Sequence, residues 1–150
     1  MPVNPAAAIR PSSATASSAP RITVAAIAFL RADGAVLTVR KRGTRAFMLP
    51  GGKPEVGESA VDTAIREVRE ELGLEIAPAD LRLLGTFATR AANEADHALL
   101  ATVFSTRTPV EPVVQAEIDE LRWVVPVEAV DDPSQAPLNR EHVFARLAVL

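Results

Sequence analysis

Three glutamates crowd one turn of a helix that the sequence predicts. Glu67, Glu70 and Glu71 are separated by steps of three and four residues, so they share one helical face. Like charges at these spacings repel, and the last turn of a helix favours cations over anions. Bound divalent cations would reverse both effects. The alternative is a solvated acidic face, partly neutralised by Arg66 and Arg69.

A glycine pair precedes this helix. The segment 47–52 ends in Gly51-Gly52, and glycines allow unusual backbone angles and the close approach of a ligand. The chain has no cysteine, so disulfides, thiol chemistry and the soft ligands of structural zinc are excluded. Any metal must therefore be held by oxygen atoms or by the two histidines.

The helix that carries the glutamates is predicted over residues 60–72. Ser59 can cap its start, and Gly73 stands where a C-terminal cap glycine belongs. Apolar residues recur at the spacing of one buried helical face. These residues are Val61, Ala64, Ile65, Val68 and Leu72.

The rest of the chain alternates predicted strands with a second helix. Residues 22–30 are nearly all apolar, which is typical of a strand covered on both faces. Asp33-Gly34 signals a hairpin, so residues 35–40 are expected to pair back onto that strand. Further strands are expected at 81–88, 99–105 and 121–125, and a last helix from about Arg140, with Val143, Phe144 and Leu147 on its apolar side. This order indicates an α/β fold with a mixed sheet between helices.

The longer spacing pattern is that of a family motif. Gly52 is followed after five residues by Glu58, and after seven more by the run 66–74, Arg-Glu-Val-Arg-Glu-Glu-Leu-Gly-Leu. Here the chain resembles the Nudix hydrolase family (MutT-like), whose box is Gly-x5-Glu-x7-Arg-Glu-U-x-Glu-Glu-x-Gly-U, with U aliphatic. Residues 52–74 match every specified position. The resemblance implies the Nudix α/β/α sandwich, with a mixed β-sheet between helices, for residues 21–150.

The resemblance also implies roles for the box residues. Glu70 and Glu71 are expected as the principal Mg²⁺ ligands, and Glu67 as a metal ligand or the general base. Arg66 would orient these carboxylates, the Gly52 carbonyl would be another ligand, and Glu58 would have a supporting role. Mg²⁺ prefers such hard oxygen ligands, and Mn²⁺ can substitute for it.

One more acidic candidate lies outside the box. Glu117 precedes Trp123 by six residues, a placement similar to an additional metal-binding or base glutamate of the MutT-type nucleoside-triphosphate pyrophosphohydrolases. We therefore expect Glu117 to be a catalytic and metal-binding residue. Glu120 is its rival in the same loop and Glu111 a weaker one. The alternative for Glu117 and Glu120 is charge on an exposed connection.

Three residues are candidates for binding substrate. Lys53 could meet phosphate oxygens, with an ordinary surface lysine as the alternative. Phe47 could stack on a base, although an aromatic side chain beside a strand more often belongs to the core. Asn93, with Glu94 and His97, lies in a polar stretch that is either a binding loop or an ordinary turn.

Two aromatic residues receive no role in the expected site. Trp123 is expected in the core. His142 lies near the start of the last helix, where a lone histidine is more often structural or exposed than catalytic.

The expected reaction is Mg²⁺-dependent hydrolysis of a nucleoside diphosphate linked to another group. Family members that hydrolyse ADP-ribose carry a downstream proline where this chain has Thr89 and Arg90, and those that hydrolyse dinucleoside polyphosphates carry a tyrosine, which this chain lacks entirely. By elimination, a normal or oxidised nucleoside triphosphate, cleaved to monophosphate and pyrophosphate, is the leading substrate. ADP-ribose, a nucleotide sugar or another dinucleotide-type substrate is the alternative. A non-catalytic nucleotide sensor and a purely structural domain are alternatives of other classes.

Composition limits the remaining partners. The net charge is −3 and the pI about 5.4, so a nucleic-acid polymer is not expected. No apolar run is long enough for a membrane helix, so a cytoplasmic protein acting on a small-molecule nucleotide is expected, and a homodimer stays open. Residues 1–20, rich in Ala, Ser and Pro, are expected to be a disordered tail. These residues include Arg10 and no acidic residue, so a cleaved organellar leader is the alternative.

Overall fold

Strand β1 (Arg21–Phe29) is the centre of a four-stranded mixed sheet. The computed structural model describes residues 21–94 and 96–150, so the tail expected at 1–20 lies outside the described residues. Strand β1 pairs in parallel with β5 (Ala98–Thr106) and antiparallel with the short β3 (Gly51–Gly52). Strand β4 (Arg82–Arg90) pairs antiparallel with β5 and forms the far edge, which gives the order β3-β1-β5-β4.

The predicted pairing of the second strand is wrong. The turn at Asp33-Gly34 forms, but β2 (Val36–Lys41) pairs antiparallel with β6 (Ile118–Val124) in a separate two-stranded sheet. Only one bridge, Leu30 to Val36, joins β2 to the end of β1. The edge of β1 that β2 would use is occupied, because the Ile27 amide donates to the Pro50 carbonyl at 3.0 Å and the glycine pair follows in β3.

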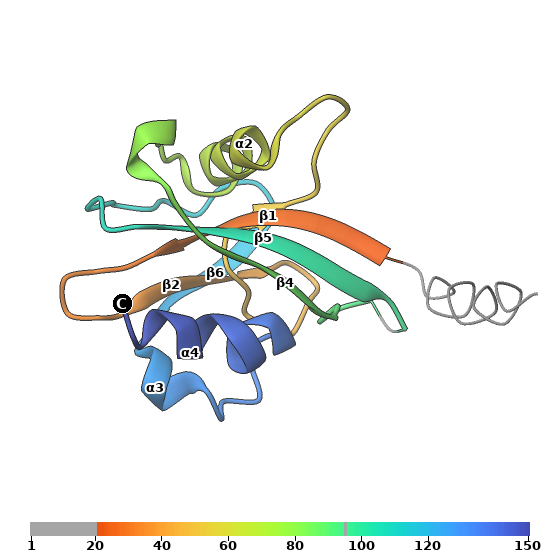
Figure 1. The fold of residues 1–150 in the computed structure, drawn as a ribbon, viewed down its shortest axis with the longest axis vertical. Helices are drawn as coiled ribbons and strands as arrows, with labels where there is room; N and C mark the ends of the chain where they lie inside the picture. The colour runs from red at the N-terminus through yellow and green to blue at the C-terminus, as the bar shows by residue number, and fades with distance from the viewer. Residues whose placement is uncertain (1–20, 95) are drawn as a thin grey trace, which may run out of the picture.

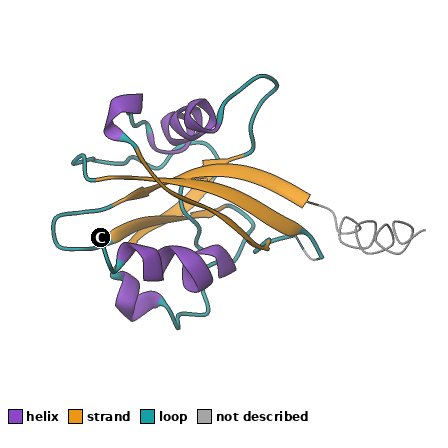
Figure 2. Cartoon of the chain, in the orientation of Figure 1, coloured by secondary structure: helices purple, strands orange, loops and turns teal. Residues whose placement is uncertain are grey.

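Helices cover both faces of the four-stranded sheet, so the predicted α/β/α sandwich is confirmed (Figures 1 and 2). Helix α2 (Ala60–Leu72) lies on one face, and α3 (Pro126–Ala129) and α4 (Phe144–Leu147) lie on the other. Successive residues of β1 alternate between the two cores, as the apolar run predicts. Ala25, Ile27 and Phe29 belong to the same cluster as Ala64, Val68 and Leu72, whereas Ala26, Ala28 and Leu30 belong to the cluster of Val143, Phe144 and Leu147.

The ends of α2 agree with the predicted signals. The Ser59 hydroxyl accepts a hydrogen bond from the Asp62 amide at 3.1 Å. At the other end Gly73 adopts the left-handed conformation, with φ of +66°, and its amide donates to the Arg69 carbonyl. These caps fix where the last turn ends and therefore where its glutamates stand relative to the sheet.

The C-terminal helix begins slightly earlier than predicted. A turn of π-helix, η3 (Asn139–Val143), runs directly into α4, and a short 3₁₀ turn, η2 (Pro78–Asp80), precedes β4. The three apolar residues expected to face the core, Val143, Phe144 and Leu147, are buried. Among the described helices, none is long and apolar enough to cross a membrane.

Packing of α4 on the sheet predicts a large cost for truncating Leu147, which is 5% exposed. Leu147→Ala should lower the free energy of unfolding by about 2–5 kcal/mol, because it removes buried methyl groups and leaves a cavity. Leu83→Ala is the matched control, because Leu83 is 63% exposed, and it should change that free energy by about 0.5 kcal/mol or less. Chemical denaturation measures both, and equal effects would contradict the docking of α4.

Candidate active site

Glu71 is a buried carboxylate at the junction of α2 and the glycine loop. Its side chain is 6% exposed, and its Oε1 accepts a hydrogen bond from the Gly51 amide at 3.1 Å. Burial raises the pKa of the Glu71 carboxyl to about 8, against the attraction of Lys41 and the bond from Gly51, which lower it. A carboxylate in this position is stabilised when a cation lies beside it.

Lys41 provides that cation in the structure. Its Nζ lies 3.6 Å from Glu71 Oε2. The register of β2 against β6 shifts between Arg40 and Lys41, and such irregularities redirect side chains. Sequence reasoning did not single out Lys41, because nothing in the local pattern marks this irregularity or the long-range pairing of β2 with β6.

Arg66 connects the loop to the helix. It donates to both carboxylate oxygens of Glu58, from Nε at 2.7 Å and Nη2 at 2.9 Å, and from Nη1 to Glu67 Oε1 at 2.9 Å. Its Nη2 also donates to the Lys53 carbonyl at 3.0 Å. These bonds raise the pKa of Arg66 and, from the other side, lower the pKa of Glu58 to about 2. Arg66 and Glu58 are therefore ion-paired and hold the loop against α2.

Gly52 is the point of closest approach between the loop and the helix. A Cβ atom placed on Gly52 would lie 2.5 Å from the carboxyl carbon of Glu67, so no other residue fits without moving that side chain. Gly51 is equally confined, because a Cβ there would lie 2.2 Å from the Ala25 carbonyl oxygen. The glycine pair therefore brings backbone atoms directly against Glu67 and Glu71.

The donor set fits a divalent cation such as Mg²⁺. Glu67, Glu71 and the more exposed Glu70 offer carboxylate oxygens from neighbouring positions of α2. In the described part of the chain, no three acidic or histidine side chains already converge as a metal-binding group. Instead the carboxylates are held by Arg66 and Lys41, which supply the positive charge.

A cavity of about 200 Å³ adjoins this acidic cluster. Gly51 and Gly52 form part of its wall, and Lys41, Lys53 and Arg90 line it as well. Its far side is formed by η3 and the segment before it, where Asn139 is fully buried. The same two glycines thus face the carboxylates on one side and the cavity on the other.

Asn139 carries an unused hydrogen-bond acceptor at this cavity. Its Nδ2 donates to Gln135 Oε1 at 3.0 Å and to the Phe47 carbonyl at 3.3 Å. Its Oδ1 is buried and has no partner among the described residues, and the same holds for Gln135 Nε2. Such unpaired polar atoms are costly and call for a ligand or water. The sequence carried a signal for Asn139, because it shares the buried helical face of Val143 and Leu147 at steps of four.

The family model for the NUDIX domain matches residues 19–147. The chain belongs to the Nudix hydrolase family. Its Nudix box, residues 52–74, comprises β3, the loop with Glu58 and helix α2. The arrangement of Arg66, Glu67 and Glu71 around the glycine pair is the structure that this motif adopts here.

Known Nudix proteins share parts of the sequence and the whole fold. The uncharacterized Nudix hydrolase YvcI of Bacillus subtilis is 33% identical over 63% of this chain, and an RNA pyrophosphohydrolase of Halorhodospira halophila is 43% identical over 35% of it. The matches span 60% and 28% of those two proteins. The MutT protein of Methanosarcina mazei has a similar structure, with a TM-score of 0.72 at 22% identity, over 88% of this chain and 96% of that one. The ORF135 protein of Escherichia coli has a TM-score of 0.68 at 25% identity, over 88% and 92%.

The acidic candidates outside the Nudix box differ in their surroundings. Glu120 is engaged in ion pairs, with Arg40 at 3.3 Å and Arg122 at 3.5 Å, and Glu111 is exposed. Glu117 is exposed too, but its loop docks on the end of α2, where the Gln115 amide donates to the Glu71 carbonyl at 2.9 Å. Glu111 and Glu117 make no ion pair with a described residue, and the loop that carries both reaches the end of α2, because the Val113 amide also donates to the Leu72 carbonyl at 3.0 Å. The role of Glu117 as a metal ligand stays a prediction.

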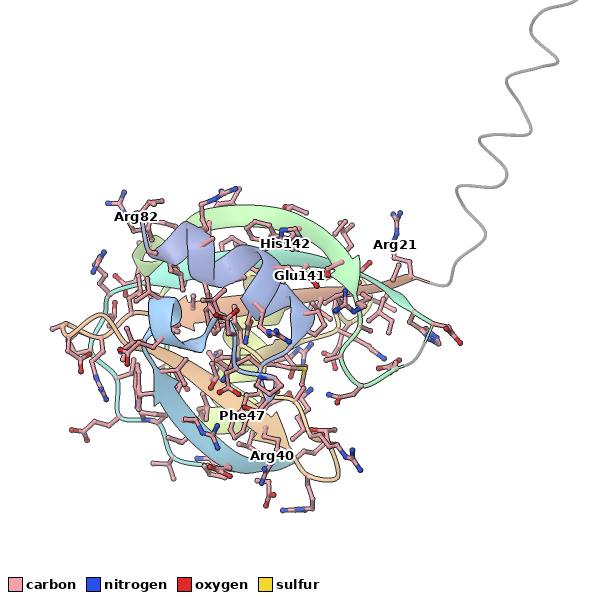
Figure 3. All side chains as sticks on the ribbon, turned by 90° about the horizontal axis from the view of Figure 1, so that it is seen from below. Arg21, Arg40, Phe47, Arg82, Glu141 and His142 are labelled. Atoms are coloured by element: carbon pink, nitrogen blue, oxygen red, sulfur yellow. The ribbon has the colours of Figure 1, made fainter. Side chains whose placement is uncertain are left out.

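Phe47 does not stack on a ligand in this structure. Its ring is 1% exposed and is not part of the cavity wall, so the predicted substrate contact is contradicted. The guanidinium of Arg122 lies 4.0 Å from the ring centroid, and that of Arg40, labelled near Phe47 in Figure 3, lies 5.4 Å from it. Phe47 is a core residue, and its backbone carbonyl, which binds Asn139, is the part that faces the site.

The other predicted substrate contacts lie at the cavity. Lys53 lines it, is 64% exposed and has its Nζ 3.8 Å from Glu94 Oε1. Asn93 lines it as well, with its Nδ2 3.8 Å from Met48 Sδ, in the turn between β4 and β5 that also holds His97. His142, which received no role, stacks on Phe87 with ring centroids 5.5 Å apart.

The raised pKa of Glu71 predicts how the metal-free protein responds to pH. Because the folded carboxyl has a pKa of about 8 and an ordinary unfolded value of 4.5, the folded state binds the proton more tightly. The protonated Glu71 carboxyl therefore contributes to the free energy of unfolding below about pH 4.5. This contribution, on the order of a few kcal/mol, is lost as pH rises through 8. Thermal unfolding in a chelator measures this loss, and Glu71→Gln should flatten it. A wild-type loss that persists in Glu71→Gln would contradict the burial of this charge.

Proposed function

We propose that this chain is a Mg²⁺-dependent Nudix hydrolase that cleaves a nucleoside triphosphate, normal or oxidised, to a monophosphate and pyrophosphate. The observation that carries the proposal is the shared wall formed by Gly51 and Gly52. These residues separate the Glu67 and Glu71 carboxylates from a cavity by no more than a backbone. A phosphate chain that extends from the cavity past these two glycines would therefore lie close to the Glu67 and Glu71 carboxylates.

The chain's residues divide the work of the reaction. Mg²⁺, or Mn²⁺ in its place, would supply positive charge for the phosphate oxygens and lower the pKa of a bound water. Glu71, Glu70, Glu67 and the Gly52 carbonyl would hold the metal, with Glu117 as an additional ligand. Glu67 is our choice for the base that accepts the proton of the attacking water, because Arg66 and Gly52 confine its carboxylate.

Positive side chains around the cavity suit a triphosphate. Lys41, Lys53 and Arg90 all line it. Charges of this sign stabilise the phosphate oxygens of the substrate and the negative charge that the leaving group gains. Arg90 is paired with Glu141 at 2.8 Å, whereas Lys41 and Lys53 make longer contacts, with Glu71 at 3.6 Å and with Glu94 at 3.8 Å.

The size of the cavity favours one base over two. A volume of about 200 Å³ lies below the range of roughly 300–1,000 Å³ that drug-sized ligands occupy, so it suits a single ring system. Asn139 Oδ1 would accept a hydrogen bond from an amino or imino group of that base. The name of one protein of similar structure agrees with this choice, since it is the dihydroneopterin triphosphate pyrophosphohydrolase of E. coli.

Replacing one metal ligand tests the catalytic part of the proposal. Glu71→Gln should lower turnover by roughly two orders of magnitude or more, because it removes a charge from the metal site and keeps the side-chain shape. Glu75→Gln is the matched control, because Glu75 lies just beyond α2 and its one ion pair with a described residue is with Arg69. Turnover is measured with Mg²⁺ on a panel of nucleoside triphosphates, ADP-ribose, nucleotide sugars and dinucleotides, with products identified by mass.

Each outcome of that panel decides between the alternatives. Release of pyrophosphate from a triphosphate supports the proposal, whereas preference for ADP-ribose or a nucleotide sugar replaces the substrate and keeps the metal site. A folded wild type that binds nucleotide and cleaves nothing indicates the non-catalytic sensor. Near-normal turnover in Glu71→Gln would refute the assignment of Glu71.

Removal of the Asn139 amide tests base recognition. Asn139→Ala should lower the ratio of kcat/KM for the preferred base to kcat/KM for the other bases by about tenfold, because the acceptor that distinguishes the bases is removed. The readout is a ratio between substrates, so a general loss of folded enzyme would not move it. An unchanged ratio would exclude Asn139 from base recognition.

A further inference from the structure

A second cleft lies at the opposite end of the central sheet from the cavity of the active site. It has a volume of about 770 Å³ and is formed where β4 begins, where β5 ends and where α4 ends. Strand β1 contributes Ile22, Val24 and Ala26 to the first cavity, whereas Leu30, the residue after β1, lines this one. In Figure 3 Arg82, at this cleft, and Arg21, at the start of β1, lie at opposite ends of the molecule.

Three arginines from three different segments line this cleft. They are Arg82 at the start of β4, Arg107 directly after β5, and Arg146 on α4. The side chains of Arg82 and Arg107 make neither a hydrogen bond nor an ion pair with any residue that the structure describes. Arg146 is held in place, because its Nη1 donates to the Leu84 carbonyl at 2.9 Å and its guanidinium lies 5.4 Å from the Phe87 ring.

The three arginines outnumber the acidic side chains that line the cleft. Among the described residues that line it, Asp80 is the one acidic side chain, and it forms no ion pair with the arginines. The chain as a whole is acidic, with 19 Asp and Glu against 16 Lys and Arg. Three like charges that line one cleft repel one another, and a bound anion would reverse this repulsion.

A hydroxyl group adds a second kind of donor. Ser105 lines the cleft, is 8% exposed, and its hydroxyl has no hydrogen-bond partner among the described residues. The neighbouring Thr106 hydroxyl, by contrast, is bonded to Thr108 at 3.0 Å. Ser105 is therefore an almost buried donor that a ligand in the cleft could satisfy.

The chemistry of these donors fits a phosphate group. A guanidinium matches phosphate oxygens with paired hydrogen bonds, and a phosphomonoester offers three terminal oxygens and nearly two negative charges to the three arginines. A carboxylate offers only one charge. The cleft is also much larger than an inorganic ion, and Leu30, Leu84 and Leu150 give it an apolar wall.

We propose that this three-arginine cleft, defined by Arg82, Arg107 and Arg146, is a second binding site for a small organic phosphomonoester, separate from the catalytic cavity. The phosphate is held by the arginines and by Ser105, and the organic part lies against the leucines. The site needs no metal, because its positive charge comes from the side chains themselves.

Titration of ¹⁵N-labelled full-length protein with AMP, and separately with inorganic phosphate, tests the site by amide chemical shifts. A chelator is present, so the acidic cluster holds no metal. Saturable shifts are expected at Leu84 and at residues 105–107, distinct from any at the glycine pair. AMP is expected to bind more tightly than inorganic phosphate, because only AMP reaches the leucine wall.

Paired variants decide whether the arginines are responsible. The double variant Arg82→Ala with Arg107→Ala should weaken binding roughly tenfold or more. The matched control, Arg21→Ala with Arg42→Ala, removes the same charge from exposed positions whose side chains make no hydrogen bond or ion pair with a described residue, and should change binding by about twofold or less. Unfolding curves establish that both variants fold.

Several outcomes would overturn the site. No saturable shift at residues 105–107, an unchanged affinity in the double variant, or equal weakening by the control pair each removes it. Equal affinity for AMP and inorganic phosphate would contradict the proposed contact between the organic part of the ligand and the leucines. Turnover plays no part in this experiment, so its result stands apart from the fate of the proposed hydrolase activity.

Discussion

The close approach of the glycine loop to helix α2 is the contact on which the site depends. Gly51 donates its amide to a buried carboxylate, and Gly52 leaves no room for a Cβ atom beside Glu67. The approach is possible because Gly51 and Gly52 also form strand β3, which is fixed on the edge of β1. One short strand therefore sets both the position of the sheet edge and the distance between backbone and carboxylates. The displacement of β2 from that same edge is a consequence of this arrangement.

The acidic cluster is stabilised by two cations of different kinds. Arg66 is a fixed partner, because it binds Glu58 through two bonds and belongs to the same helix as Glu67. Lys41 comes from another sheet, and it meets Glu71 at 3.6 Å, a looser contact. Arginine forms rigid paired hydrogen bonds, whereas lysine is a flexible point charge. The cluster thus combines an arginine held by several hydrogen bonds with a lysine that makes a single, longer contact.

The sequence predicted the features that depend on neighbouring residues, and it missed the contacts between residues far apart in the chain. The bounds of α2 and its caps at Ser59 and Gly73 follow from residues within a few positions of each other. The pairing of β2 with β6 joins residues about 80 positions apart, and no spacing in the sequence encodes it. Lys41 depends on that pairing and was missed for this reason. Phe47 was assigned wrongly because its enclosure depends on Arg122, which the same pairing brings beside it.

Metal binding under the proposed function would be coupled to the cations that now hold the carboxylates. A divalent ion at Glu71 would repel Lys41, since both carry positive charge and both would use Oε2, the oxygen that the Gly51 amide does not bind. Lys41 already lines the cavity, so the displaced amine would meet a phosphate by turning toward that space. The cost of burying Glu71 without a metal would then be reduced by the ion, and the cation released would be available to the substrate. In this arrangement the metal and the phosphate chain would each strengthen the binding of the other through a single lysine.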